Sequence, residues 1–336
     1  MYLPASDRYD GAMRYRRAGQ SGVLLPAISL GLWQNFGDDS RFDRCLEMLH
    51  YAFDHGITSF DLANNYGPPP GAAEALLGRA LRQSFRPYRD ELFITTKAGH
   101  DMWPGPYGSW GSRKHLTASL DQSLQRLGLD YVDLFYSHRY DPATPLEETV
   151  RTLADFVRQG KALYVGLSKY PADVAARAYD ALEALGVPCL VYQGRYNLYC
   201  RAPESDVLPQ AAGRGVGFVA FSPLAQGLLT DRYLHGIPAD SRVTHSQFLH
   251  REQLTPEVLA RTARLNDLAA GRGQSLAGMA LAWLLHDARV TSVIVGASST
   301  RQLADNLQAL DGPPFDAETL RRIDEIAPPP APEQKA

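Results

Sequence analysis

The sequence has few cysteines. Only three occur in 336 residues, Cys45, Cys189 and Cys200, and no two of them form a CxxC pair. Disulfide frameworks and structural zinc sites need more cysteines at closer spacing. We therefore expect no disulfide scaffold and no bound metal. The odd number of scattered thiols fits a reducing environment, so we expect a cytoplasmic location.

The chain also lacks a strong charge imbalance and any long hydrophobic run. Its formal net charge of −3 gives no broad basic field for nucleic acid or an anionic membrane surface. No apolar run approaches the roughly 20 residues that span a bilayer. The first twenty residues carry several charged side chains and no apolar core, unlike a secretory signal. We expect neither a nucleic-acid partner nor a membrane partner.

Several common site motifs are missing as well. No GxGxxG opens a helix after the first predicted strand, and no GxxxxGK[ST] occurs anywhere. These absences argue against a Rossmann domain and a P-loop. The sequence also contains no HExxH and no GxSxG, which argues against a zinc protease and an α/β hydrolase.

What the chain does have is a regular alternation of short apolar segments and longer amphipathic segments. The apolar segments are mostly continuous, which is typical of strands buried on both faces. The segments between them have helical spacing, and those at 42–56 and 112–128 end in glycine. Eight β-then-α units in one series predict an α/β fold, a closed (β/α)8 or TIM barrel. The predicted strands lie at 27–33, 57–63, 91–97, 131–137, 162–168, 188–193, 216–222 and 290–297.

Two segments depart from this repeat. Residues 13–27 read as a hairpin before the first barrel strand, placed to cap the bottom of the barrel. Residues 223–255, after the seventh strand, form a long polar insertion of the kind that is usually functional or disordered. We expect one domain over residues 1–336, with its core at 13–327 and flexible tails.

Four chemically distinct residues lie at the carboxyl ends of the predicted strands. Asp61, Lys97 and His138 close three of them, and Tyr66 lies in the loop five residues after Asp61. Active sites of such barrels lie on the loops at this end, so the four side chains should converge. Tyr66 would be the acid, with Lys97 lowering its pKa from about 10 and Asp61 holding Lys97 charged. His138 would hydrogen-bond the substrate oxygen or pass a proton.

This set of four predicts a catalytic site that protonates a carbonyl oxygen while a hydride reaches the carbonyl carbon. Taken singly, each residue has an ordinary explanation as a solvated strand end or a tyrosine packed on the barrel rim. Aromatic residues of the same loops could wall a pocket for a small carbonyl substrate, although packing on the rim explains them equally well. These aromatic residues are Trp33, Trp103, Tyr107 and Trp110.

A further group at this end of the barrel suits an anion. A helix is predicted to begin near Ser299, directly after the last strand, and the free N–H groups of a helix N-terminus attract phosphate. Arginines of the insertion could add charge-assisted hydrogen bonds. The residues concerned are Gly296, Ser298, Gln302 and Asn306, with Arg232 and Arg242 from the insertion.

Together these residues resemble the aldo-keto reductase superfamily over nearly the whole chain. FDLANNYG at 60–67 carries the Asp and Tyr of that family's catalytic tetrad, TTKAG at 95–99 carries the Lys, and FYSHR at 135–139 carries the His. FSPLAQGLLT at 221–230 and GASSTRQLADNLQAL at 296–310 resemble its cofactor-phosphate segments. Within the superfamily the sequence is most similar to a bacterial group of L-glyceraldehyde 3-phosphate reductases, which is related to the β subunits of voltage-gated potassium channels.

The resemblance implies NADPH bound across the top of the barrel without a Rossmann domain. Ser168 and Gln193 would hold the nicotinamide carboxamide, and Phe221 would stack on its ring. The implied pyrophosphate contacts are Ser222, Leu224, Ala225 and Gly227. The implied 2′-phosphate contacts are Arg232, Ser298 and Gln302, and Arg242 and Asn306 would lie at the adenine. Trp33, Asp61 and Gly296 complete the predicted cofactor site.

The sequence departs from the family pattern at a few of these positions. Lys169 stands where many members carry Asn, and Ser299 stands where close relatives often carry Arg. Gly194 and Arg195 replace a more usual Pro-Ser, and Arg232 stands for a Lys.

The function that these features predict is NADPH-dependent reduction of small aldehydes and ketones, of the L-glyceraldehyde 3-phosphate or methylglyoxal class. One alternative is an NADPH-binding regulatory subunit with weak reductase activity, although the channel relatives carry Asn where this chain has His138. Another is an aldolase-type barrel that uses Lys97 as a Schiff-base amine, against which its pairing with Asp61 argues. A homo-oligomer is also possible.

Overall fold

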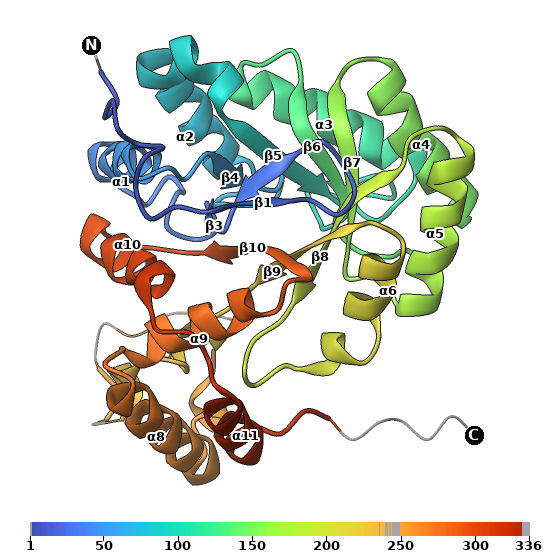
Figure 1. Cartoon of the computed structure of the whole chain (residues 1–336). Helices are drawn as coiled ribbons and strands as arrows, with labels where there is room; N and C mark the ends of the chain where they lie inside the picture. The colour runs from blue at the N-terminus through green and yellow to red at the C-terminus, as the bar shows by residue number, and fades with distance from the viewer. Residues whose placement is uncertain (1, 235, 239–240, 242, 244–248, 331–336) are drawn as a thin grey trace.

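The protein is built around a closed barrel of eight parallel strands (Figure 1), and the computed structural model describes residues 2–234, 236–238, 241, 243 and 249–330. The strands follow one another around the barrel in the order in which they follow along the chain. All eight predicted strands and the predicted TIM barrel are confirmed. The strands are β3 (Ile28–Gly31), β4 (Ser59–Asp61), β5 (Phe93–Ala98), β6 (Val132–Ser137), β7 (Ala162–Ser168), β8 (Cys189–Arg195), β9 (Gly217–Phe221) and β10 (Val290–Val295).

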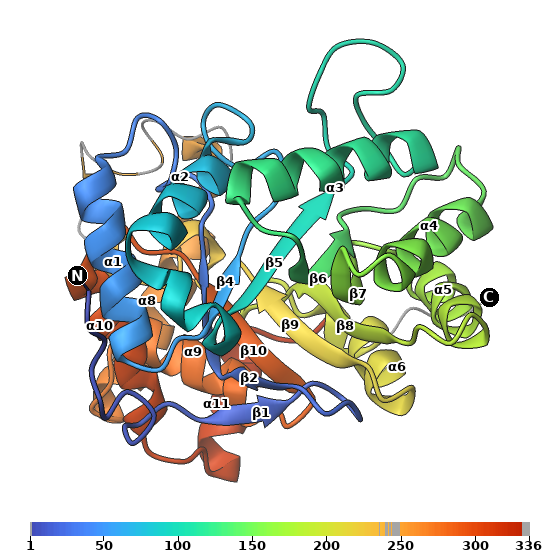
Figure 2. The ribbon, with the colours of Figure 1, turned by 90° about the horizontal axis from the view of Figure 1, so that it is seen from above.

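Helices surround this barrel, as the view from above shows (Figure 2). The predicted helices at 42–56 and 112–128 are confirmed as α1 and α3, and α3 ends at Gly128, whose left-handed backbone (φ 67°) suits glycine. Within the described residues, no helix is both long and apolar enough to cross a membrane. The helices are α1 (Phe42–Asp54), α2 (Ala72–Ala80), α3 (Arg113–Leu127), α4 (Leu146–Arg158), α5 (Ala172–Ala184), α6 (Val207–Gly213), α8 (Pro256–Gly271), α9 (Leu276–His286), α10 (Thr300–Leu307) and α11 (Ala317–Ile326).

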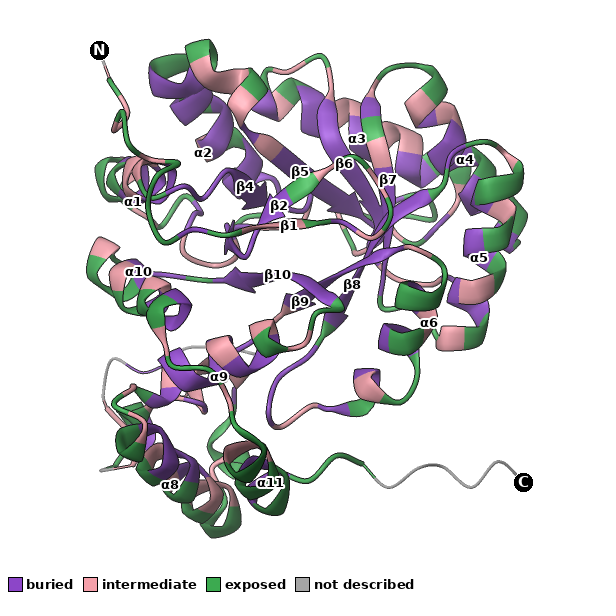
Figure 3. Cartoon of the chain, in the orientation of Figure 1, coloured by how far each residue is buried: buried purple, intermediate pink, exposed green. Residues whose placement is uncertain are grey.

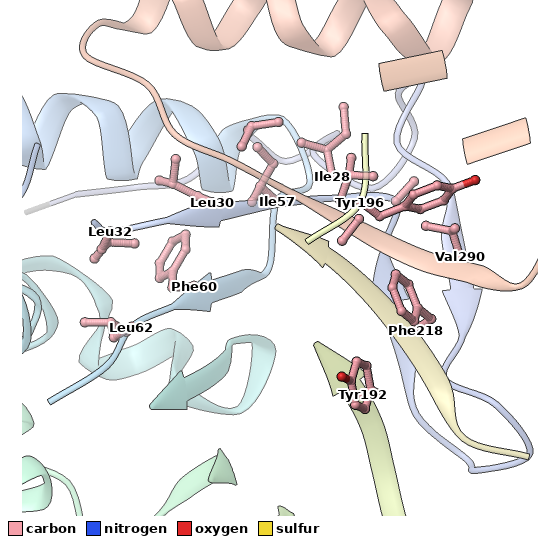
Figure 4. Close-up of a cluster of buried hydrophobic side chains, with 14 of the residues drawn as sticks. Ile28, Leu30, Leu32, Ile57, Phe60, Leu62, Tyr192, Tyr196, Phe218 and Val290 are labelled. Atoms are coloured by element: carbon pink, nitrogen blue, oxygen red, sulfur yellow. The ribbon is translucent and has the colours of Figure 1, made fainter. Parts of the chain in front are cut away.

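The barrel strands bury apolar side chains on both of their faces, which explains why they read as continuous apolar runs (Figure 3). On β6, Leu134 and Tyr136 join the cluster that fills the barrel. Phe135, between them, packs against Phe156 of α4 with ring centroids 5.2 Å apart. Figure 4 shows part of the larger hydrophobic cluster to which Phe135 and many helix residues belong.

An antiparallel hairpin, β1 (Tyr15–Arg17) and β2 (Leu24–Pro26), covers the amino-terminal end of the barrel. Leu25 belongs to the same buried cluster as the side chains inside the barrel. The hairpin turn is held by a hydrogen bond from the Gln20 amide to the carbonyl of Gly215, just before β9. The predicted cap on the barrel bottom is therefore confirmed.

The opposite, carboxyl-terminal end carries the irregular backbone. Among the described residues, six other than glycine have a positive φ, and all six lie in loops that follow barrel strands. Such conformations are sparsely populated and persist where the surrounding structure or a function requires them. The predicted long insertion between β9 and α8 is also present, and its described residues include short 3-10 turns. The six residues are Gln34, Trp110, Lys169, Ser222, Ala225 and Gln226.

Candidate active site

Lys97 lies at the centre of the site, and its side chain is wholly buried. Parallel pairing of β4 with β5 places Asp61 opposite Thr95, and Lys97 lies two residues further along the same face of β5. The Lys97 ammonium donates hydrogen bonds to Asp61 Oδ2 at 2.6 Å, to the Leu62 carbonyl at 2.5 Å and to the Tyr66 hydroxyl at 3.4 Å. All three ammonium donors therefore have a partner.

Asp61 is held from three directions. Besides the bond from Lys97, its Oδ1 accepts hydrogen bonds from the Thr95 hydroxyl at 2.8 Å and from the Gln193 side-chain amide at 2.9 Å. Gln193 comes from β8, across the barrel from β4. This carboxylate therefore fixes the position of the ammonium and links the two sides of the barrel mouth.

Tyr66 presents its hydroxyl to the Lys97 ammonium, which approaches the phenol oxygen and leaves the phenol's own proton available. The ring neighbours Trp33 and His138, with centroids 6.4 and 6.0 Å away. Burial of the hydroxyl, and then the charge of Asp61, raise the pKa of Tyr66 well above its ordinary value. The predicted lowering of this pKa by Lys97 is therefore wrong for the free protein, because burial outweighs the ammonium, and Tyr66 is a neutral proton donor.

His138 follows β6 and is almost wholly buried. Burial, and then the charge of Lys97 with smaller contributions from other basic residues, hold the pKa of His138 well below its ordinary value. Its imidazole is therefore neutral and suits a hydrogen bond to a substrate oxygen better than donation of a full proton. Among the described residues, its Nδ1 atom has no hydrogen-bond partner.

The residues predicted to hold a nicotinamide lie on neighbouring strands. Ser168 pairs in register with Gln193, and both side chains are buried at the carboxyl ends of β7 and β8. The Ser168 hydroxyl is buried and, within the described residues, has no hydrogen-bond partner. A buried polar group of this kind is costly unless a ligand or water satisfies it, so the pair fits a carboxamide. Phe221 ends the next strand, β9, and its ring is partly exposed.

The loop after β9 has an unusual backbone. Ser222, Ala225, Gln226 and Gly227 all have a positive φ. The Asn197 side-chain amide donates to the Ser222 carbonyl at 2.8 Å and anchors the start of this loop. Strained turns of this kind form backbone concavities in many anion sites, so the loop is a candidate for the predicted pyrophosphate contacts, which also include Leu224.

The loop after β10 is organised around the start of α10. Ser298 donates hydrogen bonds from its amide (2.9 Å) and its hydroxyl (3.1 Å) to the Gln302 side chain, and Ser299 caps the helix. Gly296 is exposed at the start of this loop, and Asn306 is buried on α10. The structure thus places three residues predicted at the 2′-phosphate and adenine, Ser298, Gln302 and Asn306, on one loop and the helix that follows it.

Of the two arginines predicted to bind the cofactor from the insertion, only Arg232 lies within the described residues. Arg232 is exposed in the short turn Asp231–Tyr233, and its amide donates to the Thr230 hydroxyl. Arg242 lies outside the described residues, so its predicted place at the adenine stays a prediction from the sequence.

The three predicted pocket tryptophans are distributed unequally around the tetrad. Trp33 lies beside Tyr66, and Trp110 stacks on the guanidinium of Arg139, the residue after His138, at 3.6 Å. Trp103 instead packs on His115 at the start of α3, with ring centroids 5.0 Å apart. Its loop lines a separate open hollow, made by residues 101–105 and Ser109. Trp33 and Trp110 are therefore better placed than Trp103 to wall the pocket.

The model of the Aldo/keto reductase family matches residues 27–328. The chain belongs to the aldo-keto reductase family. This aldo-keto reductase is 54% identical over 331 residues to an L-glyceraldehyde 3-phosphate reductase of Escherichia coli O157:H7, a match that covers 97% of this chain and 95% of the relative. The protein of that name from E. coli strain K12 is 53% identical over the same shares. An Arabidopsis thaliana relative named "Probable voltage-gated potassium channel subunit beta" is 36% identical over 307 residues, 89% of this chain and 92% of the relative.

The resemblance drawn from the sequence motifs is thus confirmed at the level of the family and of its reductase and channel-subunit relatives. This aldo-keto reductase is an oxidoreductase that uses a nicotinamide cofactor and acts on a small molecule.

Sequence reasoning missed several residues that hold the site in place. Thr95 and Asn197 are ordinary polar residues whose roles depend on which strand lies next to which. His100 packs edge-on against His138, with ring centroids 4.5 Å apart, and was not singled out. Its position three residues after Lys97, beyond the end of β5, was the available signal.

Replacing Lys97 with methionine tests the buried ion pair. The Lys97→Met variant leaves the Asp61 carboxylate buried without its cation, which costs about 3–5 kcal/mol of folding free energy in such pairs. We expect that loss in urea unfolding, together with severe loss of carbonyl reduction.

The double variant Asp61→Asn/Lys97→Met removes both charges and serves as the control. It should recover most of the lost stability while remaining inactive. A Lys97→Met protein as stable as the wild type would show that the pair is not desolvated, and a fully active one would remove Lys97 from the site.

Proposed function

We propose that this aldo-keto reductase catalyses the NADPH-dependent reduction of small aldehydes and ketones, with Tyr66 as the general acid. The observation that carries the proposal is the contact of the neutral hydroxyl of the partly buried Tyr66 with the Lys97 ammonium, at 3.4 Å. A phenol with a high pKa gives up its proton only where the resulting negative charge is stabilised.

A nicotinamide cofactor held at this site would supply the hydride for the carbonyl carbon. Tyr66 transfers its proton to the carbonyl oxygen, and the Lys97 ammonium stabilises the charge that develops on the phenol oxygen. Asp61 keeps Lys97 oriented through the 2.6 Å ion pair. His138, which is neutral, hydrogen-bonds the same carbonyl oxygen and holds it near Tyr66. Donors fixed in advance where charge develops are among the largest contributions to enzymatic rate.

We assign the cofactor contacts by the same reasoning. Ser168 and Gln193 would hold the carboxamide, Phe221 would stack on the nicotinamide ring, and Trp33 would complete this part of the cofactor site. The strained loop after β9 receives the pyrophosphate through Ser222, Leu224, Ala225 and Gly227. The 2′-phosphate and adenine contacts are Arg232, Arg242, Gly296, Ser298, Gln302 and Asn306.

The names of the relatives support the proposed substrate class. The E. coli proteins are named for L-glyceraldehyde 3-phosphate, and we place this enzyme in that class or in the methylglyoxal class. Trp33 and Trp110 form the apolar walls, with Trp103 further out. The cysteines are free in the structure, as expected of a cytoplasmic protein, and the proposed location is the cytoplasm.

A regulatory subunit that binds NADPH is the second candidate, supported by the 36% identity with the plant protein named as a channel subunit. The complete set of Asp61, Tyr66, Lys97 and His138 favours catalysis. An aldolase that uses Lys97 as nucleophile is disfavoured, because a buried ammonium paired with Asp61 has no free lone pair.

Replacing Tyr66 with phenylalanine tests the acid role. The Tyr66→Phe variant lacks the proton donor and keeps nearly all of the proposed contacts to the dinucleotide. General acid catalysis contributes ~10²–10⁴-fold to the rate, so kcat for carbonyl reduction should fall below a tenth of the wild-type value. Binding of NADPH, followed by cofactor fluorescence, should stay near normal.

Tyr164→Phe is the matched control, because Tyr164 lies near the start of β7, at the other end of the barrel. It should leave the rate unchanged. A Tyr66→Phe enzyme that keeps more than a tenth of the wild-type kcat would remove Tyr66 from the acid role.

Cofactor choice provides a separate test at Arg232. We expect NADPH to bind more tightly than NADH, with Arg232 forming charge-assisted hydrogen bonds to the 2′-phosphate. The Arg232→Ala variant should weaken NADPH binding by about ten- to a hundredfold, the value of roughly 1.5–3 kcal/mol for such a bond. NADH, which lacks that phosphate, is the internal control and should bind as before. Equal losses for both cofactors, in their dissociation constants, would contradict the assignment.

A further inference from the structure

Basic side chains gather on one side of the proposed pocket, at the carboxyl ends of four neighbouring strands. His100 follows β5, Arg139 follows β6, Lys169 follows β7, and Arg195 ends β8. Figure 2 shows these four strands side by side in the barrel. We call these four residues the Lys169 cluster. The Lys169 and Arg195 side chains are exposed, whereas His100 and Arg139 are partly buried behind them.

The Lys169 cluster lies directly beside the residues proposed for catalysis. The Lys169 ammonium is 3.3 Å from His100 Nε2, and the His100 ring packs against His138. The same ammonium lies 5.5 Å from the centre of the Phe221 ring, and Arg195 pairs in register with Phe221. One imidazole therefore separates Lys169 from the residue proposed to bind the carbonyl oxygen.

Positive charge in the Lys169 cluster is poorly balanced. Within the described residues, neither Lys169 nor Arg195 forms an ion pair, and the carboxylate nearest Arg139 is that of the exposed Asp101, at 3.7 Å. The Lys169 side chain is exposed, but neighbouring protein atoms partly desolvate its ammonium. This desolvation, and then the charges of Lys97, Arg195 and Arg139, lower the pKa of Lys169 to about 8. Like charges brought together without a counter-charge create a strong local attraction for an anion.

The backbone at Lys169 is also in an unfavourable conformation for its residue type. Its φ of 55° lies in the left-handed region, which side chains with a Cβ atom adopt at a cost and which Asn tolerates better. Lysine is therefore present despite both charge repulsion and backbone strain, as expected if its ammonium meets a ligand.

We propose that Lys169 and Arg195 bind the phosphate group of a short phosphorylated aldehyde or ketone, with its carbonyl group directed toward His138 and Tyr66. The proposal rests on the proposed reductase function and specifies its substrate. The Arg139 guanidinium already contacts the Gly99 carbonyl (2.8 Å), the Ser109 hydroxyl (3.0 Å) and the Trp110 ring. Arg139 therefore contributes positive charge near the phosphate without binding it directly. The His100 imidazole lies between Lys169 and His138. This separation suits a substrate with a few carbon atoms between its carbonyl group and its phosphate group.

The proposal is tested by steady-state kinetics with a phosphorylated substrate and its analogue without the phosphate. Glyceraldehyde 3-phosphate and glyceraldehyde share the carbonyl end and differ in the phosphate. Lys169→Asn and Arg195→Gln should each raise KM for the phosphorylated substrate by about ten- to a hundredfold, as expected for the loss of a hydrogen bond to a charged group. KM for glyceraldehyde, kcat and the dissociation constant of NADPH should not change.

Lys161→Gln is the matched control, because it removes a lysine from the turn between α4 and β7, at the opposite end of the barrel. It should leave all of these constants unchanged. Asparagine suits the backbone at 169, so thermal unfolding of Lys169→Asn should match the wild type or exceed it.

Binding without turnover separates this proposal from the reductase function. Calorimetric titration of the wild-type protein should detect glycerol 3-phosphate but not glycerol, and Lys169→Asn should lose this binding. A protein that reduces no carbonyl but binds glycerol 3-phosphate through Lys169 would refute the reductase function and keep the phosphate site.

Three results would overturn the phosphate site. The first is equal KM values of the wild type for both substrates. The second is a Lys169→Asn variant that loses NADPH affinity while its KM for glyceraldehyde 3-phosphate is unchanged, since Lys169 would then contact the cofactor. The third is a Lys169→Asn variant whose KM rises for glyoxylate, a carboxylate substrate, and does not rise for glyceraldehyde 3-phosphate.

Discussion

The ion pair between Asp61 and Lys97 is the interaction on which the rest of the site depends. Both groups are buried at the barrel mouth, 2.6 Å apart, and each is held by further hydrogen bonds from neighbouring strands. An isolated ammonium at this depth would be strongly disfavoured, so the carboxylate is required to keep it charged. Because Lys97 also contacts the Tyr66 hydroxyl, the same pair fixes where negative charge can develop during proton transfer. Tyr66 contacts this ammonium directly, and His138 packs against the Tyr66 ring.

The barrel places the residues that stabilise the fold and the residues proposed for catalysis in different parts of the molecule. Apolar side chains fill its interior and its interface with the helices, and the β1–β2 hairpin closes the end away from the site. The loops at the other end carry every non-glycine residue of the described chain with a positive φ. Strain, buried unpaired polar groups and clustered basic residues all occur there, where cofactor and substrate are proposed to bind. The molecule thus tolerates local costs at the site because the rest of the barrel is regular.

Much of this could be predicted from the sequence, because it depends on patterns that are local in the chain. Eight apolar runs in series predicted the barrel, and the positions of Asp61, Lys97 and His138 at strand ends predicted their convergence. The pKa of Tyr66 could not be predicted, because its direction depends on how deeply the hydroxyl is buried. The Lys169 cluster could not be predicted either, because its four residues come from four different strands and meet only in the folded barrel. Motifs read one segment at a time identify each residue and leave the distances between them unknown.

The central claim is that Tyr66 is a protonated phenol beside a charged Lys97, and its ionisation can be observed directly. Carbon-13 NMR of protein labelled at the tyrosine Cζ atoms, with the Tyr66→Phe spectrum to assign the signal, follows this one group as the pH is raised. The account predicts that the Tyr66 signal keeps the chemical shift of the neutral phenol from neutrality past pH ~10, the ordinary tyrosine pKa. A Tyr66 signal that titrates near neutral pH in the free protein would contradict it.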